Sequence, residues 1–231
     1  MQVVVLCGGK GTRLSEYTEQ IPKPLIEVGG KPILLHIIEM YSKYGYNDFV
    51  LCLGYKGDKI RKYFENKQSF KIDFVDTGID SNKADRIVKI KNYVKGDDFF
   101  VTYGDDLSDV DINALLKFHY KNKKIVTLTA IDLMSPFGIL KVNKKWEITE
   151  FKEKPKLKYF MNGGFYVFNK KIFDYIKQGY DLEKETFEDL SKEKMICAFY
   201  HKGFWKSMNT LKDVIELNEM FENGNMPWMI K

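Results

Sequence analysis

Three glycines, a lysine and an arginine lie within six positions of one another, directly after a short apolar run near the start of the chain. The run at residues 2–6 reads as a buried strand, and Gly8, Gly9 and Gly11 follow it with Lys10 and Arg13. Glycine permits close backbone approach and positive φ, so amide groups of such a loop can face phosphate oxygens while the two cations supply charge. The spacing fits neither a Walker A loop nor a dinucleotide fingerprint. We interpret the loop as a triphosphate site, with a tight strand-to-helix turn as the alternative.

A second candidate is Lys23, which lies between Pro22 and Pro24. The two rings limit the backbone on either side of the lysine, so its ammonium group is preorganised. A fixed positive charge suits a phosphate group that gains charge during a reaction. An ordinary proline-stiffened loop with an exposed lysine is the alternative.

The third candidate is a cluster of carboxylates after the apolar run at residues 99–103. Gly104 and Asp105 end this run, and in open α/β sheets ligands bind at the carboxyl ends of the strands. Mg²⁺ prefers one or two carboxylates together with substrate phosphates and water, so we expect Asp105 to be a metal ligand. Asp109 and Asp111 are expected to cap the helix that follows.

The elements that must position these residues alternate along the chain. Short apolar runs at 2–6, 49–53 and 99–103 are each followed by an amphipathic stretch, at 32–44, 58–65 and 111–120. This order is typical of strands and crossover helices, and it predicts an α/β fold with a mostly parallel sheet. Further strands are expected at 125–131, 137–142 and 163–168, and a final helix at 211–223. No linker divides the chain, so residues 1–231 are predicted to form a single domain.

Composition narrows the class of protein. The 37 Lys and Arg against 32 Asp and Glu give a net charge of +5 that is spread along the chain, so we expect no nucleic-acid partner. No apolar stretch approaches membrane-spanning length, and the first residues do not read as a signal peptide. Three cysteines without metal-ligand spacing fit reduced thiols in the cytoplasm. The three histidines likewise have no ligand spacing, and Cys7 is expected to be a buried hydrophobe rather than a nucleophile.

The ordered motifs resemble the sugar-phosphate nucleotidyltransferases, and among them the cytidylyltransferases that act on hexose 1-phosphates. The resemblance runs almost from end to end through GGKGTRLS, PKPLIEVGGKPIL, GYKG, VDTG, TYGDD, EKPK, MNGGFYVF, FWKSMNTLKD and MPW. It implies a three-layer sandwich around a Rossmann-like sheet, an enzyme of nucleotide-sugar biosynthesis that uses CTP, and release of pyrophosphate.

The resemblance also implies roles for individual residues. Arg13, Lys23 and Asp105 would be catalytic, and Mg²⁺, with Mn²⁺ as an alternative, would bind Asp105. The nucleotide would be bound by Leu6, Gly8, Gly9, Lys10, Gly11, Thr12, Arg13, Thr77 and Gly104. The phosphorylated acceptor would be bound by Glu153, Lys154, Asn162, Gly163 and Trp205.

The chain departs from the family pattern at three places. Asn209 replaces the family's second metal-binding aspartate, and Asp106 replaces a glycine, so both are candidate metal ligands beside Asp105. Lys83, Ala84 and Asp85 replace Thr-Gly-Gly and are expected near the base and the acceptor. The family's long insertion before the VDTG segment is missing. That insertion helps to build the family's oligomer, so a homo-oligomer stays an open expectation here.

These departures leave three functions to be distinguished. The first is cytidylyl transfer from CTP to a sugar 1-phosphate such as glucose 1-phosphate. The second is the same transfer to a non-sugar phosphate, such as a phosphorylated amino acid (phosphoglutamine) or amino alcohol. The third is a regulatory binding module without catalysis, which the retained Arg13, Lys23 and Asp105 disfavour.

Overall fold

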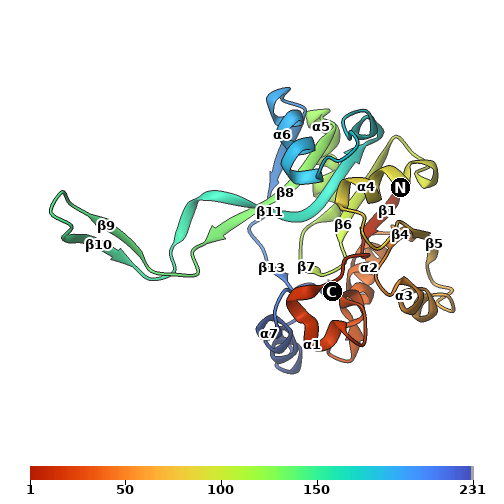
Figure 1. Cartoon of the computed structure of the whole chain (residues 1–231), viewed down its shortest axis with the longest axis horizontal. Helices are drawn as coiled ribbons and strands as arrows, with labels where there is room; N and C mark the ends of the chain where they lie inside the picture. The colour runs from red at the N-terminus through yellow and green to blue at the C-terminus, as the bar shows by residue number, and fades with distance from the viewer. Residues whose placement is uncertain (230–231) are drawn as a thin grey trace.

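A computed structural model describes residues 1–229 of the chain, and its centre is a seven-stranded sheet (Figure 1). The strand order is β12-β8-β11-β6-β1-β4-β5. β1 (Gln2–Leu6) pairs in parallel with both β4 (Asp48–Leu53) and β6 (Asp98–Tyr103), whereas β11 (Lys156–Asn169) runs antiparallel to β6 and to β8 (Val126–Met134). The mostly parallel α/β sheet expected from the sequence is therefore confirmed.

The alternation of side chains along β1 explains the three layers. Val3 and Val5 belong to one core cluster, together with residues of the helix at 33–43, and Val4 and Leu6 belong to a second cluster on the other face. All five residues of β1 are buried. Because both faces of the strand are covered by apolar side chains, its sequence is a continuous apolar run. The predicted three-layer sandwich is confirmed.

The remaining elements follow the expected order with small shifts at their ends. β5 (Lys71–Asp76) and β12 (Ile196–Tyr200) form the two edges of the sheet. The α-helices are α1 (Ser15–Thr18), α2 (Ile33–Lys43), α3 (Gly57–Phe64), α4 (Lys83–Lys89), α5 (Ile112–Asn122), α6 (Phe187–Lys192) and α7 (Leu211–Glu222), and a π-helix spans Leu182–Thr186. Short 3-10 helices occupy Thr12–Leu14, Lys23–Leu25, Lys91–Tyr93 and Lys170–Asp174.

Two small strand pairs lie outside the central sheet. β7 (Asp106–Ser108) pairs antiparallel with β13 (Trp205–Ser207), and β2 (Glu27–Val28) pairs with β3 (Lys31–Pro32).

Asp111 caps α5 as predicted, since its carboxylate accepts a hydrogen bond from the Ala114 N–H at 2.9 Å. The expected cap at Asp109 is wrong, because that carboxylate instead lies 2.9 Å from Nε2 of His201.

One segment leaves the body of the molecule (Figure 1). β9 (Ile139–Val142) and β10 (Ile148–Lys152) form a separate two-stranded ribbon, which continues from the ends of β8 and β11. We call residues 134–160 the arm. The strand expected at 137–142 exists, but every residue of β9 is exposed, so it belongs to the arm and not to the central sheet. Along the described chain, no helix has both the length and the apolar character needed to cross a membrane.

Candidate active site

A cavity of about 530 Å³ opens at the carboxyl ends of β1 and β6. Leu6 and Tyr103, the last residues of these strands, line it, together with the glycine loop on one side and β7 and β13 on the other. Parallel strands bring their carboxyl ends to one edge of the sheet, which is where ligands bind in open α/β folds. The cavity therefore lies where the sequence placed the site.

The glycine loop is packed against a buried arginine. Arg86 donates hydrogen bonds to the carbonyl oxygen of Gly8 at 3.0 Å, to that of Leu53 at 3.0 Å and to Oγ1 of Thr77 at 2.6 Å. A Cβ atom at Gly8 would lie 2.2 Å from Nη1 of Arg86, so glycine is required there for packing. Gly11 has φ of +63°, which completes the turn, and nothing lies within 4 Å of a Cβ built on Gly9.

The two cations of the loop have different surroundings. Arg13 lines the cavity, and within residues 1–229 it forms no ion pair, so its guanidinium group is available to an anion. Lys10 is ion-paired with Asp80 at 2.8 Å on the exposed surface and does not line the cavity. Thr12 also lies outside the cavity lining, and Thr77 is buried behind it as a partner of Arg86.

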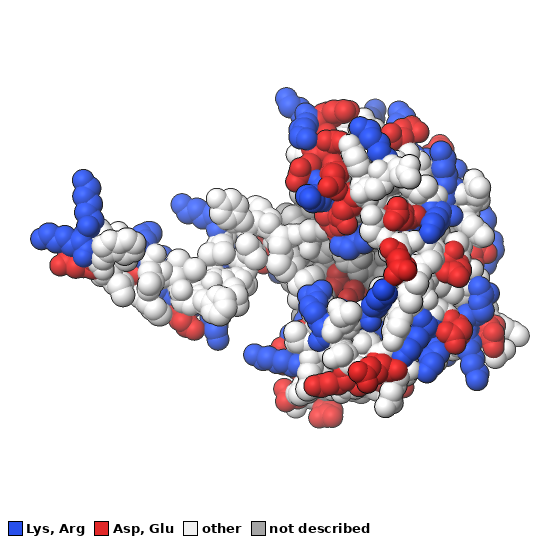
Figure 2. All heavy atoms as spheres, viewed as in Figure 1, with Lys and Arg blue, Asp and Glu red and all other residues white. Residues whose placement is uncertain are grey.

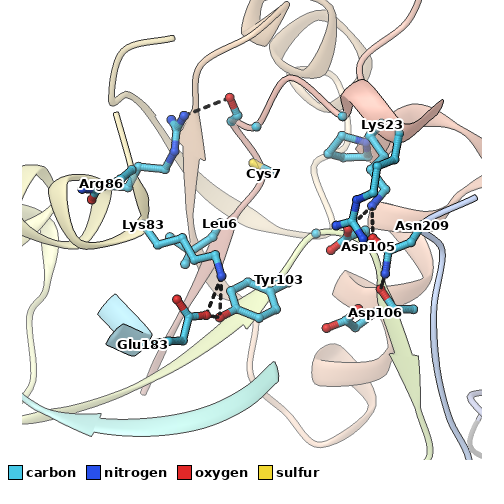
Figure 3. A pocket seen from close by; sticks show the side chains of 18 of the residues that line it. Leu6, Cys7, Lys23, Lys83, Arg86, Tyr103, Asp105, Asp106, Glu183 and Asn209 are labelled. Carbon is cyan, nitrogen blue, oxygen red and sulfur yellow. Dashed lines mark hydrogen bonds and ion pairs between the residues drawn. The ribbon is translucent and has the colours of Figure 1, made fainter. Parts of the chain in front are cut away.

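Lys23, Asp105 and Asn209 converge on one point of the cavity wall (Figure 3). The Lys23 ammonium contacts the Asp105 carboxylate and donates a hydrogen bond to Oδ1 of Asn209 at 2.9 Å. Lys23 is 9% exposed and begins a 3-10 helix between the two prolines, so the expected restriction of its backbone is present. Two anionic or polar oxygens thus face a single cation.

The hydrogen bonds of the neighbouring backbone hold Asp105 and Asn209 together. The Asp105 carbonyl accepts from the Met208 N–H at 2.9 Å, and the Asn209 N–H donates to the Asp213 carboxylate at 3.0 Å. Asp213 also closes the capping box of α7 with Thr210. Position 209 is therefore fixed between β13 and the start of α7, although it is distant in sequence from Asp105.

Asp106 lies beside this group but is buried, with 4% exposure. Burial, and next the charge of Asp105, raise the pKa of Asp106 to about 8, while a hydrogen bond with Ser207 opposes the shift. A carboxylic acid with this pKa is mostly protonated at neutral pH, so Asp106 adds less negative charge to the site than the sequence suggests.

The donor set fits a divalent cation of the magnesium type. The Asp105 carboxylate and Asn209 Oδ1 already share one cationic partner, the Lys23 ammonium, so the two side chains face a common point. Mg²⁺ is commonly held by one or two carboxylates, with phosphates and water filling its other positions. Within residues 1–229, no group of three or more His, Cys, Asp or Glu side chains is arranged to hold a metal, so a metal here would depend on substrate oxygens.

A second wall of the cavity is formed by a network around Tyr103. Lys83 pairs with Glu183 at 2.5 Å, and its Nζ lies 4.8 Å from the centre of the Tyr103 ring. The Tyr103 hydroxyl contacts the Glu183 carboxylate and lies 2.7 Å from the hydroxyl of Tyr166. Asn162 donates to the Tyr166 hydroxyl at 2.6 Å and also lines the cavity. Lys83, Glu183, Tyr103 and Asn162 line the cavity, so this wall presents one cation, one carboxylate, one hydroxyl and one amide to a ligand.

Of the three substituted residues at 83–85, Lys83 alone lines this cavity. Ala84, in the first turn of α4, is completely buried, and the Asp85 side chain accepts from the Asn82 N–H in the capping box of that helix. The expectation that all three crowd the base and the acceptor is therefore wrong, because the helical turn directs Ala84 into the core and Asp85 to the cap. Lys83 pairs with Glu183 and not with Asp85.

The predicted acceptor residues are divided between two regions. Asn162 and Trp205 line the cavity, and the Trp205 Nε1–H donates to the Gly163 carbonyl at 2.7 Å, so Gly163 supports the tryptophan from behind. The structure does not bring Glu153 and Lys154 to the cavity. They lie on the arm, and their side chains are 62% and 66% exposed. The reason is physical: the arm carries this motif away from the body.

Sequence reasoning missed Arg86, Tyr103 and Glu183 as parts of the site. Arg86 is an arginine in a short helix, and Glu183 lies in the charge-rich stretch DLEKETFED, so neither has a local signal. Cys7 is buried, as predicted. Burial raises the pKa of its thiol to about 12 and keeps the thiol protonated. Gly104 and Leu6 line the cavity as expected.

Comparison with known proteins agrees with this geometry. Residues 2–224 match the model of the family described as nucleotidyl transferase. A Bacillus subtilis (strain 168) protein named "Probable glucose-1-phosphate cytidylyltransferase" is 39% identical, with all of both chains covered. The Salmonella typhimurium (strain LT2) glucose-1-phosphate cytidylyltransferase is also 39% identical over 99% of this chain and 98% of its own. A structure of UDP-glucose pyrophosphorylase complexed with UDP-glucose shares the fold, with a TM-score of 0.75 over 96% of this chain and 98% of its own at 17% identity. The chain therefore belongs to the nucleotidyl transferase family.

Proposed function

We propose that this protein is a cytidylyltransferase that joins CTP to glucose 1-phosphate, with release of pyrophosphate and formation of CDP-glucose. The observation that carries the proposal is the convergence of Lys23, Asp105 and Asn209 beside the glycine loop, at the wall of a cavity large enough for substrates. Full-length relatives named for this reaction support the choice of nucleotide and of sugar.

The reaction needs charge stabilisation more than a general base. The second pKa of a phosphate monoester is about 6, so the acceptor phosphate is largely a dianion at neutral pH and can attack directly. Its oxygen forms a bond to the α-phosphorus of CTP, and the bond from that phosphorus to the pyrophosphate oxygen breaks. The protein must then offset repulsion between anions, as in other phosphoryl-transfer chemistry.

Each part of the cavity supplies a share of this task. Lys23 would meet the charge that develops at the α-phosphate, and Arg13 would bind the phosphates that leave. Asp105 and Asn209 would hold Mg²⁺, with Asp106 as a further candidate. When bound, the metal supplies positive charge that neutralises triphosphate oxygens. Lys83, Glu183, Asn162 and Trp205 would surround the acceptor, because all four line the cavity and the first three belong to the network around Tyr103.

The roles proposed for the other nucleotide residues differ in kind. Leu6, Gly8, Gly9, Gly11 and Gly104 line the cavity and would contact the nucleotide. Thr77 lies outside the lining and would act through Arg86, which also holds the Gly8 carbonyl. Lys10 would reach a phosphate only by leaving Asp80. We further propose that the chain works as a single domain over 1–231, of which residues 230 and 231 lie outside the described residues.

A pyrophosphate-release screen tests the function directly. The purified full chain is assayed with each of four nucleoside triphosphates against glucose 1-phosphate, with and without chelator, and Asp105→Ala is assayed in parallel. We expect release with CTP that requires a divalent cation and that the variant loses, with an unchanged circular dichroism spectrum. Full activity in excess chelator, or an active Asp105→Ala enzyme, would contradict the proposed site.

A further inference from the structure

Asn209 differs from Asp105 as a partner for a cation, because its side chain has two unlike ends. The amide oxygen accepts hydrogen bonds and can bind a cation, whereas the amide nitrogen carries two hydrogens and only donates. A carboxylate presents an oxygen whichever way it turns. An amide that turns by half a revolution presents hydrogens to the cation instead, so the use of Asn209 at this site depends on what fixes its orientation.

Packing alone does not fix this amide, because two cavities adjoin it. The face of the body in Figure 2 is hollowed at the active-site cavity, in the region where β7 and β13 lie in Figure 1. A second cavity of about 540 Å³ lies between the arm root and α7, and Met134 and Asp213 line it. Trp205, Ser207 and Asn209 line both cavities. Hydrogen bonds must therefore set the orientation of the Asn209 side chain.

Hydrogen bonds hold the two ends of the amide in different directions (Figure 3). The Lys23 ammonium donates to Oδ1 at 2.9 Å, and an ammonium group has no acceptor with which to hold the nitrogen end. The Nδ2 group donates to Oγ of Ser207 at 2.7 Å. The oxygen thus faces Lys23 and Asp105, while the nitrogen faces Ser207.

Ser207 is the partner that can keep this orientation during the reaction. In the proposed mechanism the Lys23 ammonium serves the α-phosphate, so its hydrogen bond to Asn209 is not available at every stage. Ser207 ends β13, and the next residue, Met208, donates its N–H to the Asp105 carbonyl at 2.9 Å. The serine is therefore fixed on a paired strand beside the second candidate ligand.

The Ser207 hydroxyl has a single hydrogen, and Asp106 lies where it can accept it. Asp106 stands directly opposite Ser207 in the pair of β7 and β13, and a hydrogen bond between the two side chains lowers the pKa of Asp106 against the effect of burial. A Cβ atom at Gly164 would lie 2.4 Å from Oδ2 of Asp106, so this carboxyl group is closely packed. With its hydrogen directed to Asp106, the Ser207 oxygen presents its lone pairs to Asn209.

We propose that Ser207 is a positioning residue that keeps the Asn209 amide oxygen toward a bound divalent cation, and that Asp106 orients the Ser207 hydroxyl for this task. The inference rests on the proposed metal-dependent function, and it assigns to the serine an effect that acts through Asn209. Hydrogen bonds made to metal ligands from residues behind them typically change metal affinity by about 10–100-fold. The loss of one hydroxyl should therefore be measurable in metal binding.

The factor by which Mg²⁺ tightens CTP binding reports the orientation of Asn209. The dissociation constant of CTP is measured by calorimetry on the full chain, with Mg²⁺ and with chelator, and the ratio of the two values gives the factor. We expect Ser207→Ala to reduce this factor about tenfold. The dissociation constant in chelator should stay unchanged, because the amide then has no cation to face.

Two further variants distinguish positioning from a general effect of losing a serine. Ser207→Thr keeps the hydroxyl and should retain most of the factor. Ser108→Ala is the matched control, since Ser108 belongs to β7, donates to the Phe204 carbonyl at 2.8 Å and lies outside the lining of both cavities. It should lower the melting temperature and leave the factor unchanged.

Asn209→Asp provides the sharpest test, because a carboxylate needs no fixed orientation. In this background, Ser207→Ala should change the factor by less than about twofold, as for independent sites. A tenfold loss in both backgrounds, a Ser207→Ala factor equal to that of the wild type, or a wild type whose CTP affinity ignores Mg²⁺ would overturn the proposal. Absence of CDP-glucose formation together with the expected factors would contradict the proposed function and leave the role of Ser207 standing.

Discussion

At the scale of single residues, the Lys23 ammonium contacts the side chains that would also hold a divalent cation. In the structure its ammonium is held by Asp105 and Asn209, the same oxygens that fit a divalent cation. The Lys23 ammonium contacts one carboxylate oxygen of Asp105, Oδ2, so the other oxygen stays available to a divalent cation. Because Lys23 lines the cavity, its ammonium would also stay close to the substrate phosphates.

We predict that Lys23→Ala lowers kcat by about two to three orders of magnitude, as loss of a preorganised charge at a transition state commonly does. CTP affinity should fall much less, since Arg13 and the loop remain. Steady-state kinetics and calorimetry with CTP separate these effects, with Lys71→Ala as a control whose lysine pairs with Asp48 at the surface. If Lys23→Ala loses CTP affinity and keeps kcat at saturation, the transition-state role is wrong.

Asp106 makes metal binding depend on pH if it is a ligand. Burial raises the pKa of this carboxyl to about 8, so its proton is retained at pH 6 and lost as pH rises toward 9. The deprotonated form supplies a charged ligand, and we expect Mg²⁺ affinity to increase over this range. Calorimetric titration of the wild type and Asp106→Asn at several pH values measures it. Equal slopes in both proteins would place Asp106 outside the metal shell.

At this scale the sequence predicted the residues that have local signals. Lys23 stands between two prolines and Asp105 follows a buried strand, so their types and positions indicate chemistry before folding is known. The pairing of Asp105 with Asn209 came from a family resemblance. Glu183 could not be predicted in this way, because its role depends on Lys83, a hundred positions earlier in the chain.

At the scale of elements, α4 links the glycine loop to the sheet. Arg86 projects from this helix to the Gly8 carbonyl in the loop after β1, the Leu53 carbonyl at the end of β4 and Thr77 after β5. One buried side chain thus fixes the relative positions of three strand ends. A single turn of α4 also carries Lys83, so the loop and the acceptor wall share a support.

We predict that Arg86→Met lowers the free energy of unfolding by about 3 kcal/mol, because hydrogen bonds to a buried charged group contribute about 1.5–3 kcal/mol each and are not additive. The KM for CTP should rise as well, since the loop loses its support. Urea denaturation and kinetics measure the two effects. Arg61→Met, which removes an exposed arginine bonded to the Phe74 carbonyl, is the matched control. Equal stability of both variants would contradict the support role.

Lys83→Thr tests the acceptor wall. It leaves Glu183 without its cation, and we expect the KM for glucose 1-phosphate to change about tenfold. This effect is smaller than the effect of losing a fully buried charged hydrogen bond, because Lys83 is partly exposed. The KM for CTP and the melting temperature should change little. Lys184→Ala, which removes a more exposed lysine paired with Glu185, serves as control. An altered CTP KM with an unchanged acceptor KM would place this wall at the nucleotide instead.

The elements themselves were largely predictable, with one instructive exception. Buried runs such as 2–6 and amphipathic stretches such as 32–44 have periodicities that local sequence reveals. The segment at 137–142 has the same apolar character, but its side chains face solvent in the arm. Periodicity indicates a strand and says nothing about what covers it, because burial depends on the tertiary or quaternary partner.

At the scale of the whole molecule, the active-site cavity and the arm lie at the same edge of the sheet. Helices cover both faces of the sheet, the cavity opens at the carboxyl ends of β1 and β6, and the arm leaves the body between the carboxyl end of β8 and the start of β11 (Figure 1). The second cavity at the arm root shares residues with the first. The active site and the root of the arm are thus neighbours on one surface.

The measurement that tests the central claim most directly is the kcat/KM for formation of CDP-glucose from CTP and glucose 1-phosphate by the purified full chain. The product is identified by chromatography and ³¹P spectroscopy, and a phosphorylated amino acid and a phosphorylated amino alcohol are assayed beside the sugar. We predict a value of about 10⁴ M⁻¹s⁻¹ or higher for glucose 1-phosphate, which is ordinary for a native substrate. A value several orders of magnitude lower, together with rapid use of a non-sugar phosphate, would contradict the account.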